Sequence, residues 1–161
     1  MMSLCEIENV EISDCNLTTE AMKAFKENCL GAKLKKLNVS FNTNLGVEGV
    51  GVLGSIVSNS EVEEILMRGC ILTAESMKAF KKYVGDAKIK LLHLSWNMTL
   101  GDEGLSTISE IVLQCHVETV VMRGCDFNDD QLKRFKALIA DTGVKFIHRR
   151  NDGAFHNHHV N

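Results

Sequence analysis

Cysteine recurs with the most regular spacing of any reactive residue in this chain. Cys15, Cys70 and Cys125 are separated by intervals of 55 residues, and thiolates can act as nucleophiles or as metal ligands. No C-x-x-C pair accompanies them or the remaining cysteines, so the pattern does not indicate a zinc site. We therefore interpret the three recurring thiols as small, buried structural groups.

Histidine gathers near the C-terminal end, and imidazole is the commonest metal ligand in proteins. His148, His156, His158 and His159 lie close in sequence, with Asp152 as the nearby carboxylate. Because further ligands with suitable spacing are lacking, we interpret residues 148–161 as a polar cap or tail. The sequence thus predicts neither a metal site nor a cofactor.

Motifs for catalysis are absent from the sequence. It contains no phosphate-binding glycine loop, no nucleophile elbow and no H-E-x-x-H. The acidic pairs Glu63-Glu64 and Asp129-Asp130 are adjacent in sequence, and adjacent strand residues point to opposite faces. Such pairs cannot work together as general acid and base, so we predict that the protein is not an enzyme.

An internal repeat of 55 residues organises the chain. The segments that begin at Ile7, Val62 and Val117 read IENVEISDCNLTTEAMKAF, VEEILMRGCILTAESMKAF and VETVVMRGCDFNDDQLKRF. Each copy holds two shorter units, and we place the unit starts near residues 7, 34, 62, 89, 117 and 144. A fixed period of this kind is typical of stacked repeats, so we predict a single domain over residues 1–161.

Each unit is expected to form a short strand, a turn and a helix. Apolar residues occupy positions one, four and six, as in Val62, Ile65 and Met67, which predicts a strand with one buried face. Residues that can cap the helices that follow are Thr18, Thr73 and Asn128. Six units predict an α/β solenoid, a curved parallel sheet ~25–30 Å long with strands on the concave side and helices on the convex side.

These residues give the chain a resemblance to leucine-rich repeat proteins of the ribonuclease-inhibitor type. The family pattern is L-x-x-L-x-L-x-x-N/C-x-L, and it is matched in its Cys form by Val62, Ile65, Met67, Cys70 and Leu72 and in its Asn form by Ile89, Leu92, Leu94, Asn97 and Leu100. The resemblance covers about residues 5–147 and implies a leucine-rich repeat solenoid. The last unit departs from the pattern, because Arg149 falls at its sixth position.

Charge and hydropathy exclude two classes of partner. The net charge is −3, and the lysines follow helix faces that we interpret as solvated, so no nucleic-acid partner is predicted. No apolar stretch approaches the ~18 residues that cross a membrane. Disulfides between the recurring cysteines are not expected, because two strands of separation hold them ~9–10 Å apart, and reduced thiols favour a cytoplasmic location.

Strand positions five and seven should face solvent on the concave side. At position five Leu66 and Val121 are apolar, with His93 between them and His148 assigned to the last unit. Position seven holds Arg68 and Arg123, and Arg150 in the last unit; the next position holds Phe41 and Trp96. Trp and Arg dominate interface hot spots, and their alternation allows cation–π stacking.

We hypothesise that a protein partner contacts a patch made of Phe41, Leu66, Arg68, His93, Trp96, Val121 and Arg123. The alternative is that Phe41 and Trp96 pack against the neighbouring loop as part of the repeat core. A second surface is expected at the first unit, because residues 1–4 are too few to cover its apolar side. That side would contact another copy of the chain or another part of a longer one.

Two function classes follow. The first is a non-enzymatic interaction module or scaffold. The second is a regulator that inhibits or activates a partner enzyme such as a small GTPase or nuclease, or the C-terminal repeat piece of a larger sensor or cytoskeletal regulator. The resemblance implies interaction roles of the first class, and for the second class relatives with this repeat type include activators of the Ran GTPase and an inhibitor that clasps a ribonuclease. Fold alone does not decide between them.

Overall fold

Strands and helices alternate along the chain as the repeat pattern predicts. The structure is a computed structural model that describes residues 6–149. Its strands are β1 (Asn9–Glu11), β2 (Lys36–Asn38), β3 (Glu64–Leu66), β4 (Leu91–His93), β5 (Thr119–Val121) and β6 (Lys145–Ile147). Its helices are α1 (Thr19–Asn28), α2 (Gly46–Ser58), α3 (Ala74–Val84), α4 (Gly101–Gln114) and α5 (Asp129–Ile139).

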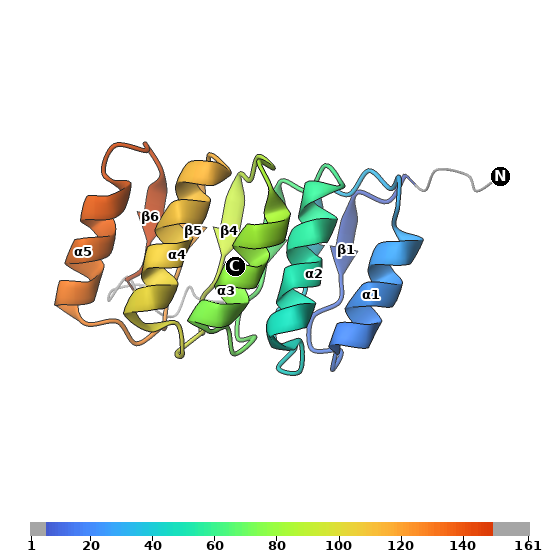
Figure 1. Cartoon of the computed structure of the whole chain (residues 1–161), viewed down its shortest axis with the longest axis horizontal. Coiled ribbons are helices and arrows are strands. Elements are labelled where there is room, and N and C mark those ends of the chain that lie inside the picture. Colours follow the sequence, from blue (N-terminus) through green and yellow to red (C-terminus); the bar gives the residue numbers. More distant parts are fainter. Residues whose placement is uncertain (1–5, 150–161) are drawn as a thin grey trace.

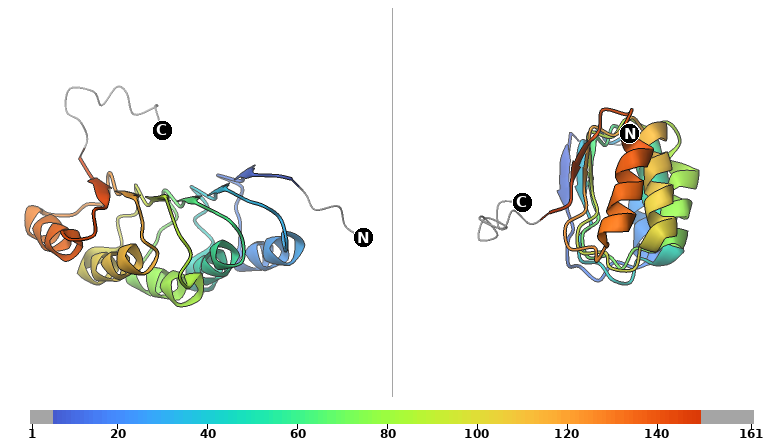
Figure 2. Two further views of the ribbon diagram at one scale, coloured as in Figure 1. Left: turned by 90° about the horizontal axis from the view of Figure 1, so that it is seen from above. Right: turned by 90° about the vertical axis from the view of Figure 1, so that its left-hand side faces the viewer.

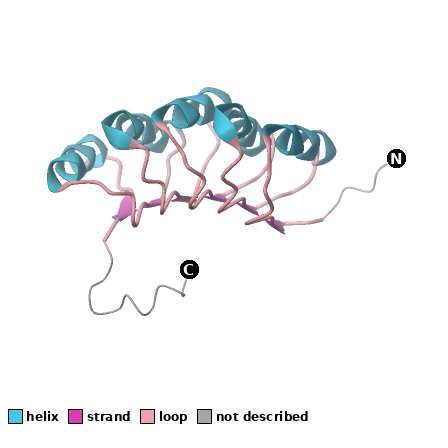
Figure 3. Cartoon of the chain, turned by 90° about the horizontal axis from the view of Figure 1, so that it is seen from below, coloured by secondary structure: helices cyan, strands magenta, loops and turns pink. Residues whose placement is uncertain are grey.

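The strands form one parallel sheet in the order β1-β2-β3-β4-β5-β6, each beside the next in the sequence. The helices lie side by side on one face of this sheet (Figure 1). Seen along the layers, the molecule is an arc with helices on its outer side and strands on its inner side (Figure 2). Figure 3 shows loops linking the two layers at every unit. The predicted curved α/β solenoid is confirmed.

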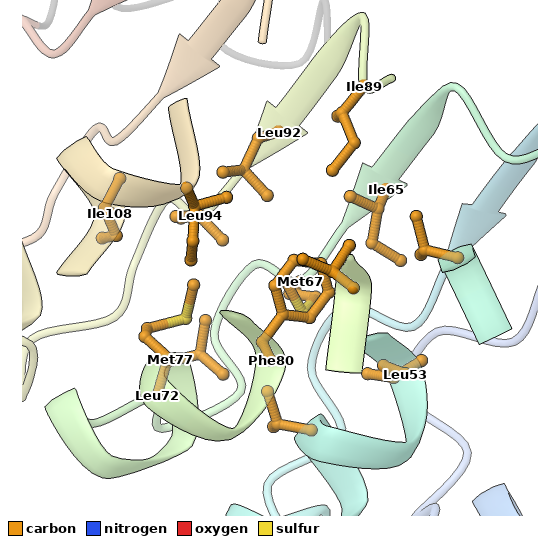
Figure 4. Close-up of a cluster of buried hydrophobic side chains, with 14 of the residues drawn as sticks. Leu53, Ile65, Met67, Leu72, Met77, Phe80, Ile89, Leu92, Leu94 and Ile108 are labelled. Atoms are coloured by element: carbon orange, nitrogen blue, oxygen red, sulfur yellow. The ribbon is translucent and has the colours of Figure 1, made fainter. Parts of the chain in front are cut away.

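The hydrophobic core lies between the sheet and the helices. Strand positions four and six point into it: Ile65 of β3 and Met67, the residue after this strand, lie in the same buried cluster as Met77 and Phe80 of α3 (Figure 4). All four side chains are fully buried. Burial of one such side chain stabilises a fold by about 1.5–3 kcal/mol, so the apolar positions of the repeat hold the two layers together.

The predicted caps begin alternate helices. The hydroxyl of Thr18 accepts the Ala21 N–H at 3.2 Å. Thr73 and Asn128 each form a reciprocal capping box with the third helical residue. These contacts satisfy backbone donors that a helix N-terminus otherwise leaves free.

Buried asparagines fasten each Asn-type unit to the unit before it. Asn97 accepts the backbone N–H groups of Cys70 and Leu72, both at 3.0 Å. Its amide nitrogen donates to the carbonyls of Met67 at 2.9 Å and Leu94 at 2.8 Å. Asn42 does the same one repeat earlier. One amide thus satisfies several buried backbone groups of two neighbouring turns.

The recurring cysteines are unbridged, and they differ in burial. Cys70 and Cys125 are buried, and each thiol lies 3.3–3.4 Å from a carbonyl of the preceding unit, Val39 or Leu94. Burial raises the pKa of Cys70 to about 11. Cys15 was expected to be buried as well but is exposed. Its thiol bonds only the carbonyl of Ser13, because no described unit precedes the first one.

Two kinds of contact join neighbouring helices. Between α2 and α3 the packing is closest, because Gly54 lets the backbone of Phe80 approach; a Cβ at residue 54 would lie 2.6 Å from the Phe80 carbonyl oxygen. Ion pairs span other helix pairs, including Lys23 with Glu48 at 2.7 Å between α1 and α2. Exposed pairs of this kind contribute little each, so the glycine contact is the tighter link.

The final strand pairs one residue earlier than the sequence spacing predicts. Val120 is opposite Phe146 and Val121 is opposite Ile147, so the last unit begins at residue 143 rather than 144. The assignment of His148 to position five is therefore wrong, because its ring lies on the core side and stacks on Phe146 at 4.7 Å. Arg149, not Arg150, follows at position seven. The shift places Phe146 against the core, where its ring meets Phe135.

Candidate partner-binding surface

Position five of the central strands forms the floor of the concave surface. Leu66 and Val121 keep only 7% of their surface exposed, and His93 between them keeps 9%. The expectation that these side chains face water is wrong. The sheet curves towards this side, so side chains on strands ~4.8 Å apart shield one another. They line the floor rather than project from it.

Arg68 and Arg123 lie beside this floor, and the same type of hydrogen bond holds the backbone of each. The Arg68 N–H donates to the hydroxyl of Ser40 at 3.1 Å, and the Arg123 N–H donates to Ser95 at 3.0 Å. Both arginines are half-buried. Their Nε atoms are shielded from water and have no hydrogen-bond partner within the described part of the chain. Of the ion pairs within residues 6–149, none involves either guanidinium.

His93 lies on β4, between the strands that lead to the two arginines. Its Nε2 is 3.0 Å from the hydroxyl of Ser95. Burial, together with the positive charges of Arg68 and Arg123, lowers the pKa of His93 to about 4. The imidazole is therefore neutral at pH 7. The positive charge of the surface comes from the arginines.

Phe41 and Trp96 form the edge of the surface, each in the turn after its strand. Their φ angles are +59° and +63°, a region that bulky residues rarely adopt. Each ring covers a glycine of the next unit: a Cβ on Gly69 would lie 2.6 Å from the Phe41 ring, and one on Gly124 would lie 2.5 Å from the Trp96 ring. Phe41 and Trp96 nevertheless have 43% and 40% of their surface exposed to solvent. Packing against the neighbouring loop and facing solvent thus occur together.

One cation–π contact links the edge to an arginine. The guanidinium carbon of Arg68 lies 5.5 Å from the centre of the Phe41 ring. The ring is therefore in contact with Gly69 of the next unit and with the charged side chain that precedes that glycine. This contact is worth about 0.5–1 kcal/mol at an exposed site, which favours one position for the Arg68 side chain.

The structure brings the seven predicted residues together on β2–β5 and the turns that follow, all on the concave side. Roles for Ser40 and Ser95, and for Gly69 and Gly124 beneath the two rings, were not among the sequence predictions. A signal for the glycines was present, because the eighth position alternates between aromatic residues and glycine. Arg149 was also missed at position seven, where its exposed side chain extends the row of arginines.

Other kinds of site find little support in residues 6–149. No group of three or more His, Cys, Asp or Glu side chains there could hold a metal ion. The histidines at 156, 158 and 159 lie outside the described residues. A groove of about 510 Å³ runs along the helix side, lined by Val47 of α2 and Tyr83 of α3 among others. Within the same residues, no helix has both the length and the apolar character of a membrane span.

Comparison with known families bears on the repeat. A model of the leucine-rich repeat matches residues 32–54 and 86–109. The matched segments are the Asn-type units, with β2 and most of α2 in one and β4 and most of α4 in the other. The sequence matches no curated protein. Leucine-rich repeats are thus present at two places in the chain, and the architecture is a leucine-rich repeat solenoid.

Proposed function

We propose that this protein is a non-enzymatic interaction module whose concave surface binds a protein partner. The contact surface consists of Phe41, Leu66, Arg68, His93, Trp96, Val121 and Arg123. One observation carries the proposal: two half-buried guanidiniums stand on this surface without a carboxylate partner among the described residues. Leucine-rich repeats commonly mediate protein–protein contacts, which supports the same reading.

The free surface leaves hydrogen-bond donors of two arginines unsatisfied among the described residues. A buried donor without a partner costs about 1–3 kcal/mol, and both Arg68 and Arg123 have one. Two aromatic residues also remain partly exposed beside them. Arginine and tryptophan in such surroundings are the side chains that contribute most to protein interfaces.

Charge reversal on the two faces of the solenoid tests the proposal. The double variant Arg68→Glu/Arg123→Glu changes the concave surface, and Lys82→Glu/Lys133→Glu changes the convex helices by the same net charge. We expect proteins captured from a cell extract by the unmodified chain to bind the convex variant equally and the concave variant at least tenfold less. Equal capture by a folded concave variant would show that the partner binds elsewhere.

The first unit supports a second contact proposal. Ile7 and Leu30 are exposed there, and we propose that this end contacts another copy of the chain or another segment of a longer one. Light scattering on the isolated chain tests self-association. We expect a concentration-dependent mass that Leu30→Lys lowers, whereas a constant monomer mass at all concentrations would exclude contact between copies.

A further inference from the structure

The concave surface carries one arrangement twice, two strands apart. Arg68 with Phe41 over Gly69 is the first copy, and Arg123 with Trp96 over Gly124 is the second. We propose that the two arginines bind two carboxylates, three residues apart, of one acidic peptide segment in the polyproline II conformation. The proposal rests on the proposed function and specifies the chemistry and the spacing that the partner presents.

Carboxylates fit the chemistry of the two arginines. A guanidinium forms paired hydrogen bonds with a carboxylate, and neither guanidinium has an acidic partner among the described residues. Their unpaired Nε–H groups add a second reason. A bound carboxylate that reached the Nε edge of each guanidinium would complete hydrogen bonds that residues 6–149 do not supply.

The separation of the two arginines selects the conformation of the segment. They follow β3 and β5, and β4 lies between these strands. Neighbouring strands are ~4.8 Å apart, so the two side chains start ~9.6 Å from each other. A polyproline II segment has three residues per turn and rises ~3.1 Å per residue, which puts residues i and i+3 on one side, ~9.3 Å apart. In an extended strand, residues on one side are ~6.6 or ~13 Å apart.

The side chains between and beside the arginines suit the same ligand. The middle of the site is apolar and uncharged, because Leu66 and Val121 form the floor and His93 is neutral at pH 7. The exposed rings of Phe41 and Trp96 stand at the edge with the same two-strand spacing as the arginines. Aromatic side chains in a groove are what proline-rich polyproline II segments dock against. Acidic and proline residues in one segment would therefore use both parts of the surface.

Trp96 allows binding at this site to be measured by fluorescence, because it is the single tryptophan of the chain. The full chain is titrated with blocked proline-rich peptides that hold two glutamates at i,i+2, i,i+3 or i,i+4, and Trp96 fluorescence reports binding. Peptides with one glutamate, and with two glutamines at i,i+3, are the controls. We expect the i,i+3 peptide to bind at least tenfold more tightly than the one-glutamate peptide. Peptides with the other two spacings should have affinities within about threefold of the affinity of the one-glutamate peptide.

Variants of the arginines locate the two contacts. Each of the variants Arg68→Gln and Arg123→Gln should lower the affinity for the i,i+3 peptide to the affinity for the one-glutamate peptide. Should a Gln variant fail to fold by circular dichroism, Arg68→Lys and Arg123→Lys keep the charge but lose the paired geometry. The lysine variants should lower severalfold the ratio between the affinities for the i,i+3 peptide and the one-glutamate peptide.

Three results would overturn the proposal. The first is affinity that follows the number of glutamates whatever their spacing. The second is tightest binding by a helical peptide with glutamates at i,i+7, which lie ~10.5 Å apart. The third is no binding of any peptide at millimolar concentration. In each case the interaction-module proposal stands if the Arg68→Glu/Arg123→Glu variant still loses its captured partners, and both proposals fail if it does not.

Discussion

The ring of Trp96 lies against the backbone of Gly124 in the next unit. A Cβ atom at residue 124 would come 2.5 Å from the Cε3 and Cζ3 atoms of that ring, and the φ angle there is +66°. Glycine is thus required twice, once by the backbone conformation and once by the ring. The exposed aromatic edge of the concave surface depends on it.

Gly124→Ala should be more destabilising than the same change at Gly101. Gly101 has a similar φ of +62°, but no atom of residues 6–149 lies within 4 Å of the added Cβ. Both variants then share the cost of a left-handed alanine, about 1–2 kcal/mol. Gly124→Ala must also displace the ring, so Trp96 emission should shift to the red. Denaturant unfolding and emission spectra measure both effects, and equal losses with unchanged emission would disprove the contact.

Asn97→Ala should destabilise the fold strongly. The side chain satisfies two backbone N–H groups and two carbonyls in a buried turn. Each group left unsatisfied costs about 1–3 kcal/mol, so we expect a loss of several kcal/mol in the free energy of unfolding. Asn44→Ala is the matched control, because Asn44 is exposed and should change stability by less than about 0.5 kcal/mol. Similar losses in both would refute the role of the buried amide.

Two glycines of α2 should respond in opposite ways to alanine. At Gly54 the new Cβ meets the Phe80 carbonyl oxygen at 2.6 Å, a backbone atom that can move only with its helix. At Gly51 the nearest atoms are side-chain atoms at 3.4 Å. Alanine favours a helix interior over glycine by about 1 kcal/mol. We expect Gly51→Ala to leave the melting temperature equal or higher and Gly54→Ala to lower it by several degrees.

Protonation of His93 should make stability depend on pH. The ordinary histidine pKa is 6.5 and the folded value is about 4, so between these values the unfolded chain binds a proton that the folded chain does not. The contribution to stability is complete above pH 6.5 and is lost as pH falls towards 4. The charged groups that face this ring are Arg68 and Arg123.

His93→Asn removes that group, and Asn38 already occupies the same position on β2. The variant should show a shallower fall in unfolding free energy between pH 6.5 and 4. Some slope remains, because burial and the charges of Lys136 and Arg149 also lower the pKa of His148. Chemical denaturation across this pH range measures the difference. A slope identical to that of the unmodified chain would contradict the low pKa of His93.

The period of the sequence predicted the fold well, because apolar residues at fixed positions have one way to be buried together. Val62, Ile65 and Met67 are all buried, and the caps at Thr73 and Asn128 form as expected. The last unit was placed one residue late. Its register is decided by Phe146 packing on Phe135, a contact between elements that the spacing of the earlier units does not encode.

The candidate site was predicted in part. The positions of Arg68 and Trp96 followed from the repeat, since any residue at a given position faces the same side. The burial of Leu66 and Val121 did not follow, because it arises from curvature of the whole sheet. Nor did the sequence show that Ser95 holds the backbone of Arg123, because that hydrogen bond joins residues 28 positions apart.

The contact of Gly54 with Phe80 lies near the middle of the stack, and in a stack each unit touches only its neighbours. Opening of the described stack should therefore start at its two ends, where a unit has one neighbour among residues 6–149. Amide hydrogens of β1 and β6 should exchange with solvent sooner than those of β3 and β4. The surface that carries Arg68 and His93 would then remain formed during fluctuations in which the terminal units come apart.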